Sequence, residues 1–198
     1  MIFTAPKQVY TFLKPFERGE VEGWMLFFHP DLIRKTHLDS QLDDYSFFNY
    51  DVVEALHLSE EEEKTINRTV EQIKNEYQQR IDNHSQRVIV SNIELLLNYS
   101  LRFYERQFNT RINQSKNVVA VFEQALKEYF KMEKNHDLGI PSIPYFAEMV
   151  HLSPHYFSDL IKKETGQTPK NHIHDFVIEK AKDLLMGSEQ SVGEIAYK

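Results

Sequence analysis

The sequence predicts a mainly α-helical protein that begins with a β-rich region. Residues 1–55 contain runs of β-branched and aromatic residues separated by proline and glycine, a pattern typical of strands and turns. Residues 59–108 carry apolar residues at helical spacing, and residues 142–166 contain two short helices with start and stop signals. A chain of 198 residues accommodates one large or two modest domains.

The composition is that of a folded protein without disulfides. Apolar residues make up 41% of the chain and aromatic residues 13%, which is enough for a hydrophobic core. The absence of cysteine excludes disulfides and thiolate metal sites and suits a reducing compartment. The longest apolar run, Trp24 to Phe28, is too short to cross a bilayer, and residues 1–20 lack a secretory apolar region. We therefore expect a soluble, cytoplasmic protein with no membrane partner.

Two candidate strands lie in the N-terminal region. The second of them spans Trp24–Phe28, and Pro15 and Gly19 separate it from the first. The apolar residues of the first strand are Val9, Tyr10, Phe12 and Leu13. Pro30 ends the second run, and a short helix is expected over residues 31–35.

A helical hairpin is predicted over residues 59–108. Ser59 and Glu62 form a capping-box pattern at its start. The first helix has one apolar stripe, formed by Ile66, Val70, Ile73, Tyr77 and Ile81. The second has a broader apolar face, formed by Ile89, Ile93, Leu96, Leu97, Leu101, Tyr104 and Phe108. A face this broad suits either the chain's own core or a second subunit, and the pattern leaves both alternatives open.

Two capped helices follow in residues 142–166, after a polar linker over 106–116 and a helix over 118–130. Ser142 is placed to cap the first helix, and Ser153 followed by Pro154 starts the second. Gly166 is expected to end the second helix in a left-handed conformation. The inward-facing apolar residues are Phe146, Ala147 and Val150 in the first helix, and Phe157, Leu160 and Ile161 in the second. This layout is that of a helix-turn-helix, although the pattern alone also fits an ordinary αα-hairpin.

The C-terminal stretch from Ile140 to Lys198 resembles the DNA-binding domain of the AraC/XylS family of transcription regulators. The residues that carry the resemblance are Ile143, Phe146-Ala147, Leu152-Ser153, Tyr156-Phe157, Leu160-Ile161-Lys162-Lys163, Thr165-Gly166, Thr168-Pro169, Ile178, Ala181-Lys182, Leu184-Leu185 and Ser191-Val192-Gly193-Glu194-Ile195-Ala196. The resemblance implies two helix-turn-helix units joined by a linker helix over about 170–186, whose buried positions would be Phe176, Ile178, Ala181, Leu184 and Leu185. Residues 191–196 resemble the first helix of the second unit, and the printed sequence ends soon afterwards at Lys198. We therefore expect an incomplete second unit and weak, salt-sensitive DNA binding.

The N-terminal region resembles the last part of the cupin-like sensor barrel of such regulators, through Gly23-Trp24 and Phe27 to Ile33. This implies four parts: the end of a cupin-like domain over 1–56, a dimerisation hairpin over 57–108, a linker over 109–116, and the DNA-binding domain over 117–198. The earlier strands of such a barrel are expected to be missing.

The resemblance also implies site residues, with helix 154–164 entering a major groove. The residues expected to face bases are His155, Ser158 and Asp159, and those expected to contact phosphates are Lys162, Lys163, Gln167, Thr168 and Asn171. For Asp159 a surface or capping role is the alternative, because a carboxylate repels phosphate. The residues expected at a dimer seam are Ile89, Ile93, Leu97, Leu101 and Tyr104.

The predicted function is sequence-specific regulation of transcription by a chain that binds DNA as a homodimer. Activation through contact with RNA polymerase is one alternative, and the sequence leaves repression open as the other. The alternative is a dimerisation or interaction module without DNA-binding activity, which the net charge of −7 favours. No enzyme or cofactor is assigned, because no P-loop, dinucleotide fingerprint or nucleophile elbow occurs. No effector is named, because its pocket would lie in the part of the barrel that is expected to be missing. His151 and His155 are spaced like zinc ligands on one helix, but the turn at Ser153-Pro154 separates them, so no metal site is expected.

Overall fold

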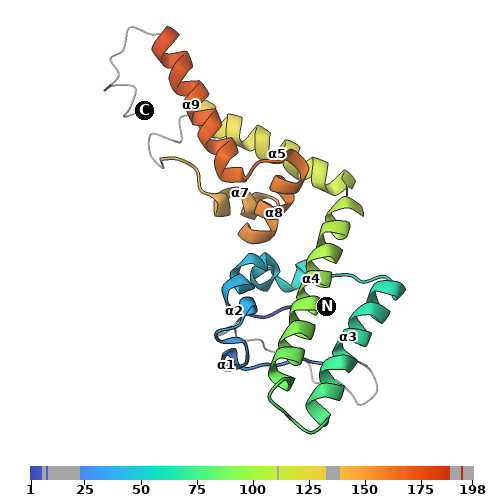
Figure 1. The fold of residues 1–198 in the computed structure, drawn as a ribbon. Helices are drawn as coiled ribbons and strands as arrows, with labels where there is room; N and C mark the ends of the chain where they lie inside the picture. Colours follow the sequence, from blue (N-terminus) through green and yellow to red (C-terminus); the bar gives the residue numbers. More distant parts are fainter. Residues whose placement is uncertain (6–7, 9–22, 111, 133–138, 188–192, 194–198) are drawn as a thin grey trace. The chain divides into compact units, whose positions relative to one another are not determined.

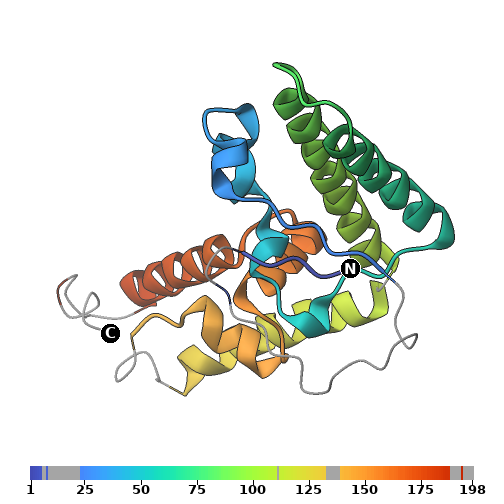
Figure 2. The same cartoon turned by 90° about the horizontal axis from the view of Figure 1, so that it is seen from below.

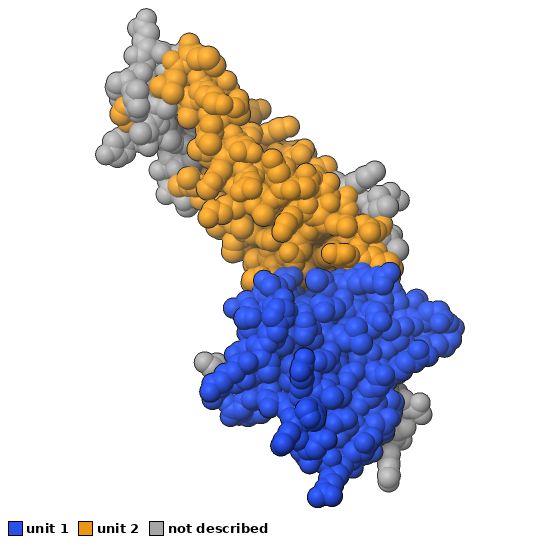
Figure 3. Space-filling view, in the orientation of Figure 1, with its two compact units in different colours: residues 1–48, 56–104 blue, residues 49–55, 105–198 orange. Residues whose placement is uncertain are grey.

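The computed structural model describes residues 1–5, 8, 23–110, 112–132, 139–187 and 193, and over these residues the regular elements are all helical. The N-terminal elements are short: α1 (Pro30–Ile33), α2 (His37–Gln41), η1 (Leu42–Asp44), η2 (Ser46–Asn49) and η3 (Val52–Glu54) (Figure 1). The longer helices are α3 (Glu60–Gln78), α4 (Ser85–Thr110), α5 (Ile112–Lys131), α7 (Ile143–Met149), α8 (Pro154–Thr165) and α9 (Pro169–Gly187). The chain forms two compact units, residues 1–48 with 56–104 (unit 1) and residues 49–55 with 105–198 (unit 2), coloured separately in Figure 3.

The predicted β remnant is wrong for the residues that the structure describes. Residues 24–28 run without strand pairing, and residues 30–54 form short α and 3₁₀ helices instead. A strand needs a neighbouring strand to satisfy its backbone groups, and none lies beside this segment within the described ranges. Met25 and Phe27 are accordingly 75% and 80% exposed, while the indole N–H of Trp24 donates to Asn67 Oδ1 at 2.8 Å. The candidate strand from Val9 to Leu13 lies outside the described residues.

In unit 1, α3 and α4 pair as the predicted hairpin. The capping box is confirmed, since Ser59 Oγ accepts from the Glu62 N–H while the Glu62 carboxylate accepts from the Ser59 N–H at 2.8 Å. Asp82 closes the turn before the second helix, because its Oδ1 accepts from the backbone N–H groups of His84 at 2.7 Å and Ser85 at 3.1 Å. This bond to His84 lowers the pKa of the Asp82 carboxyl.

The short N-terminal helices contribute aromatic side chains to the core of unit 1. Phe47 is 1% exposed and stacks on Tyr104 of α4 with ring centroids 5.5 Å apart. The Phe3 ring packs on the Phe47 ring with centroids 4.4 Å apart. Met1 and Leu56 exchange two backbone hydrogen bonds. Burial of these rings stabilises the helical N-terminal region without a sheet.

Unit 2 is built around α8, which packs against α5, α7 and α9 (Figures 1 and 2). Phe122 of α5 is 1% exposed and makes edge-to-face contacts with Phe146 of α7 and Phe157 of α8, at 5.0 and 5.5 Å between ring centroids. The predicted inward faces are thereby confirmed for Phe146, Ala147, Phe157, Leu160 and Ile161, each at most 5% exposed. Val150 is only half-buried.

Two predicted features of unit 2 differ from the structure. Of the residues assigned to a linker over 109–116, 109 and 110 belong to α4, which continues to Thr110, and 112–116 belong to α5, which begins at Ile112. In α9, Ile173 is buried, whereas Ile178 and Leu185 are 52% and 48% exposed. The helical spacing of these apolar residues predicted a buried face, but it did not show which element, if any, packs against them. Of the predicted helix over 191–196, all residues except 193 lie outside the described residues.

The Phe122 contacts predict a large effect of truncation. Phe122→Ala is expected to lower the free energy of unfolding by about 3–5 kcal/mol, because a ring shared by three helices leaves a cavity. Urea denaturation followed by circular dichroism measures this change. Phe27→Ala, at a position 80% exposed, is the matched control and is expected to change stability little. Equal losses for the two variants would contradict the proposed core.

Candidate nucleic-acid interface

The predicted helix-turn-helix geometry is present in residues 143–165. α7 ends at Met149, and the chain reverses at His151, which adopts a left-handed backbone with φ 55°. The N–H of Leu152 then returns to the carbonyl of Ala147 at 3.0 Å. Ser153 follows in an extended conformation and begins α8, so the turn is short and fixed by backbone hydrogen bonds.

Both ends of α8 are capped as predicted. Ser153 Oγ accepts a hydrogen bond from the Tyr156 N–H at 3.2 Å, and Pro154 occupies the first turn. Gly166 closes the helix with φ 78° and donates its N–H to Lys162 O at 2.9 Å. Ser142 occupies the predicted cap position of α7, but its side chain makes no capping hydrogen bond.

The residues expected to face bases share one side of α8. His155 and Asp159 are one helical turn apart, as are Ser158 and Lys162, so all four lie on neighbouring positions of the helix surface. His155 is exposed, whereas Ser158 and Asp159 are half-buried. The Ser158 hydroxyl donates to Pro154 O at 2.7 Å, which leaves its oxygen able to accept.

The residues expected to contact phosphate lie at the end of α8 and the start of α9. Lys162 and Lys163 are exposed in the last turn of α8. Gln167, just before α9, and Asn171, in the first turn of α9, are also exposed. Thr168 is half-buried, and its hydroxyl accepts from the Asn171 N–H at 3.3 Å. The hydroxyl of Thr168 therefore already serves the first turn of α9.

A carboxylate from outside the helix-turn-helix holds the start of α8. Glu54, 3% exposed, accepts from the Ser153 N–H through Oε1 at 2.7 Å and from the Ser153 hydroxyl through Oε2 at 2.5 Å. The same Oε2 accepts from the Asp51 N–H at 2.7 Å. A buried carboxylate is stable only with such donors, and the positive end of the α8 dipole adds to their effect.

A second contact from the same segment reaches a predicted site residue. The Tyr50 hydroxyl donates to Asp159 Oδ2 at 2.6 Å, and the Tyr50 ring, 7% exposed, packs edge-on against Tyr156 of α8 at 5.0 Å. Tyr156 also contacts Phe108, with ring centroids 4.9 Å apart. Segment 49–55 therefore belongs to the same unit as the helix-turn-helix.

Sequence analysis missed Tyr50 and Glu54. Glu54 lies 99 positions before Ser153, and Tyr50 lies 109 positions before Asp159, so no local spacing connects them. The only local signal is the Asp51–Glu54 capping box, which marks a turn but names no distant partner.

The residues expected at a dimer seam are largely enclosed within unit 1. Ile93, Leu97 and Tyr104 are 1%, 2% and 2% exposed, while Ile89 and Leu101 are half-buried. The apolar surface that α4 leaves exposed contains Val88 and Leu95, at 40% and 41%. The broad face of this helix is thus used mainly by the chain's own core.

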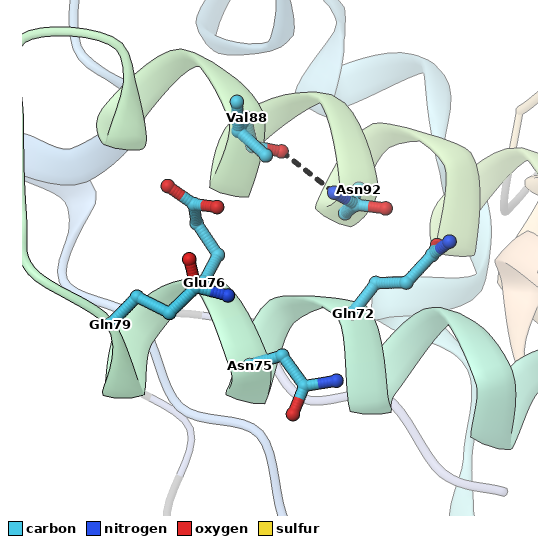
Figure 4. Close-up of a pocket in the computed structure, with 6 residues that line it drawn as sticks. All are labelled: Gln72, Asn75, Glu76, Gln79, Val88 and Asn92. Carbon is cyan, nitrogen blue, oxygen red and sulfur yellow. Dashed lines mark hydrogen bonds between the residues drawn. The ribbon is translucent and has the colours of Figure 1, made fainter.

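A polar hollow of about 270 Å³ lies between α3 and α4 in unit 1 (Figure 4). It is lined by Gln72, Asn75, Glu76, Gln79, Val88 and Asn92. The Asn92 amide donates to Val88 O at 2.9 Å within it, and the remaining lining groups are mostly amides. Over the described residues, no three His, Asp or Glu side chains gather as a metal site would require.

Comparison with known proteins agrees with this geometry. Residues 146–198 match the family described as the helix-turn-helix domain. This match supports an AraC-type helix-turn-helix domain over residues 146–198. The matched range contains α8, α9 and most of α7, but neither Tyr50 nor Glu54.

A curated relative is similar to this chain over a short stretch. The uncharacterized HTH-type transcriptional regulator YobQ of Bacillus subtilis (strain 168) is 39% identical over 51 residues. These residues are 26% of this chain and 21% of the relative, so the match spans about a fifth of that protein's length. No solved structure matches the chain. Among the helices described, none is long and apolar enough to span a membrane.

The Glu54 contact predicts an unequal effect of two serine substitutions in the helix-turn-helix domain. Ser153→Ala is expected to cost about 1–3 kcal/mol, because it removes the cap of α8 and one donor to a buried carboxylate. Ser142→Ala is the matched control and is expected to have little effect, since that hydroxyl makes no capping bond. Thermal denaturation of both variants checks this, and a comparable loss in Ser142→Ala would contradict it.

Proposed function

We propose that the chain is a sequence-specific DNA-binding transcription regulator of the AraC type and that α8 enters the major groove. The observation that carries this proposal is the polar face of α8, held by caps at both ends and by a buried apolar face against α5 and α7. A major groove about 12 Å wide admits a helix in this manner.

The chemistry of that face suits base recognition. His155 and Ser158 carry groups that donate or accept hydrogen bonds, and Asp159 carries a carboxylate that only accepts. The base that a carboxylate fits best in the major groove is cytosine, through its N4 amino group. We therefore assign direct base contacts to these three residues.

Phosphate contacts are assigned to the residues that flank this face. Lys162 and Lys163 supply positive charge at the end of α8, and the polar groups of Gln167, Thr168 and Asn171 lie where α9 begins. The chain as a whole carries a net charge of −7, so the attraction of DNA must be local to these residues.

We also propose that two copies associate through α4. Four residues of this helix, Val88, Asn92, Leu95 and Tyr99, form a stripe at alternating steps of four and three, the spacing of a coiled-coil seam. Val88 and Leu95 are 40% and 41% exposed, and Asn92 and Tyr99 are half-buried. This stripe replaces the largely enclosed residues Ile93, Leu97 and Tyr104 as the surface for a second subunit. Contact with RNA polymerase and activation of transcription belong to the same proposal.

DNA binding is tested by selection from duplexes with a randomised core, followed by fluorescence anisotropy over a salt series. The wild-type chain is expected to enrich one motif. Lys162→Ala is expected to weaken binding to every duplex alike and to reduce the slope of log K against log salt by about 1, because one phosphate contact is lost. Lys64→Ala, an exposed α3 lysine paired with Glu61, is the matched control and should leave the slope unchanged.

Dimerisation is tested by replacing the two most apolar stripe residues. Val88→Glu combined with Leu95→Glu is expected to convert a dimer to a monomer, because like charges would face each other across the seam. Light scattering of the full chain gives the mass. Met132→Glu, at a position 64% exposed on unit 2, is the control and should stay dimeric. A dimer that survives the double substitution would place the interface elsewhere.

The second candidate function is an interaction module without DNA-binding activity. The acidic net charge and the exposed apolar residues Val88 and Leu95 of α4 favour it. The selection experiment separates the two functions, since an interaction module would dimerise but enrich no DNA motif.

A further inference from the structure

Segment 49–55 of unit 2 supplies side chains to the helix-turn-helix domain from a distant part of the sequence. Unit 1 residues precede it and follow it in the chain, yet it packs with residues 105–198. Its anchor is Glu54, whose carboxylate is buried and bonded to the N–H and hydroxyl of Ser153. Gln107 of α4 adds a bond from its amide to Ala55 O at 3.3 Å.

The anchored segment brings Tyr50 to the polar face of α8. Its ring is fixed against Tyr156, and its hydroxyl donates to one oxygen of Asp159 at 2.6 Å. A hydrogen bond to a charged acceptor is stronger and more directional than one between neutral groups. The Asp159 carboxylate is therefore held in one orientation, with Oδ2 engaged by the hydroxyl.

The orientation of this carboxylate matters for base recognition. With Oδ2 bonded to Tyr50, Oδ1 remains to accept from an amino group in the major groove. Pre-orientation reduces the rotamer entropy that a side chain loses on binding. We infer that Tyr50 is a positioning residue for base recognition, acting through Asp159 to favour cytosine. This inference rests on the proposed function, since it needs α8 to enter the groove.

The test uses the full chain and the duplex selected by the wild-type protein. Duplexes with single base changes are compared with the selected duplex. The preference at a position is the ratio of the dissociation constant of the changed duplex to that of the selected duplex. The Asp159→Asn variant is measured on the same duplexes. The position at which its base preference differs from that of the wild-type chain is the base pair that Asp159 faces. The wild-type chain is expected to prefer cytosine there by about tenfold.

Tyr50→Phe keeps the ring and removes only the hydroxyl. It is expected to reduce the preference for cytosine at that position by about threefold, the effect of losing one hydrogen bond. In the Asp159→Asn background the same substitution is expected to have no further effect on the preference. Tyr77→Phe, on an α3 side chain that is 70% exposed, is the matched control and should leave the preference unchanged.

The preference separates positioning from a general loss of stability. A less stable variant has a smaller folded fraction, which changes both dissociation constants by the same factor and leaves their ratio unchanged. The double-mutant cycle further shows whether Tyr50 acts through Asp159 or independently of it.

Each contrary outcome has a distinct meaning. If Tyr50→Phe retains the wild-type preference, or if it lowers the preference equally in both backgrounds, the positioning role is overturned and DNA binding stands. If Asp159→Asn changes preference at no position, the positioning role is likewise overturned. If the wild-type chain selects no motif at all, the proposed function fails and this inference fails with it.

Discussion

The buried carboxylate of Glu54 is the contact on which the start of α8 depends. It takes donors from the Asp51 N–H, the Ser153 N–H and the Ser153 hydroxyl, so one side chain closes a turn and the beginning of a helix together. A charge buried to this extent is destabilising unless all of these bonds form. The arrangement therefore links the geometry of segment 49–55 to that of the helix-turn-helix domain.

The apolar side of α8 fixes how this helix is oriented. Phe122 joins three helices through Phe146 and Phe157, which fixes the rotation of α8 about its own axis. That rotation decides which residues face outward, and His155, Ser158 and Asp159 lie on the resulting polar face. Capping sets where the helix begins, and the aromatic core sets which side is presented.

Sequence analysis succeeded where the physical cause is local. The Ser59–Glu62 box, the Ser153 cap and the left-handed Gly166 each depend on residues within one turn, and each is confirmed. It failed over residues 24–28, because an apolar run becomes a strand only when another strand pairs with it. Periodicity likewise identified the broad apolar face of α4 but could not distinguish the chain's own core from a second subunit.

The residues of the candidate site that lie on α8 and α9 could be predicted from the sequence, whereas those in segment 49–55 could not. Patterning and resemblance located the polar face, since those residues lie together in the sequence. Tyr50 and Glu54 could not be found, because their partners are about a hundred positions away and a single sequence holds no record of that contact.

The division of the chain has a consequence for modular exchange between regulators. The chain enters unit 2 at Asn49, leaves it after Ala55 and enters it again at Glu105. A helix-turn-helix transplanted by its C-terminal segment alone would carry Ser153 and Asp159 into a host that lacks their partners. An exchange that keeps the Tyr50–Asp159 and Glu54–Ser153 bonds must therefore carry two separate pieces of sequence, and in related proteins positions 50 and 54 are expected to co-vary with 159 and 153.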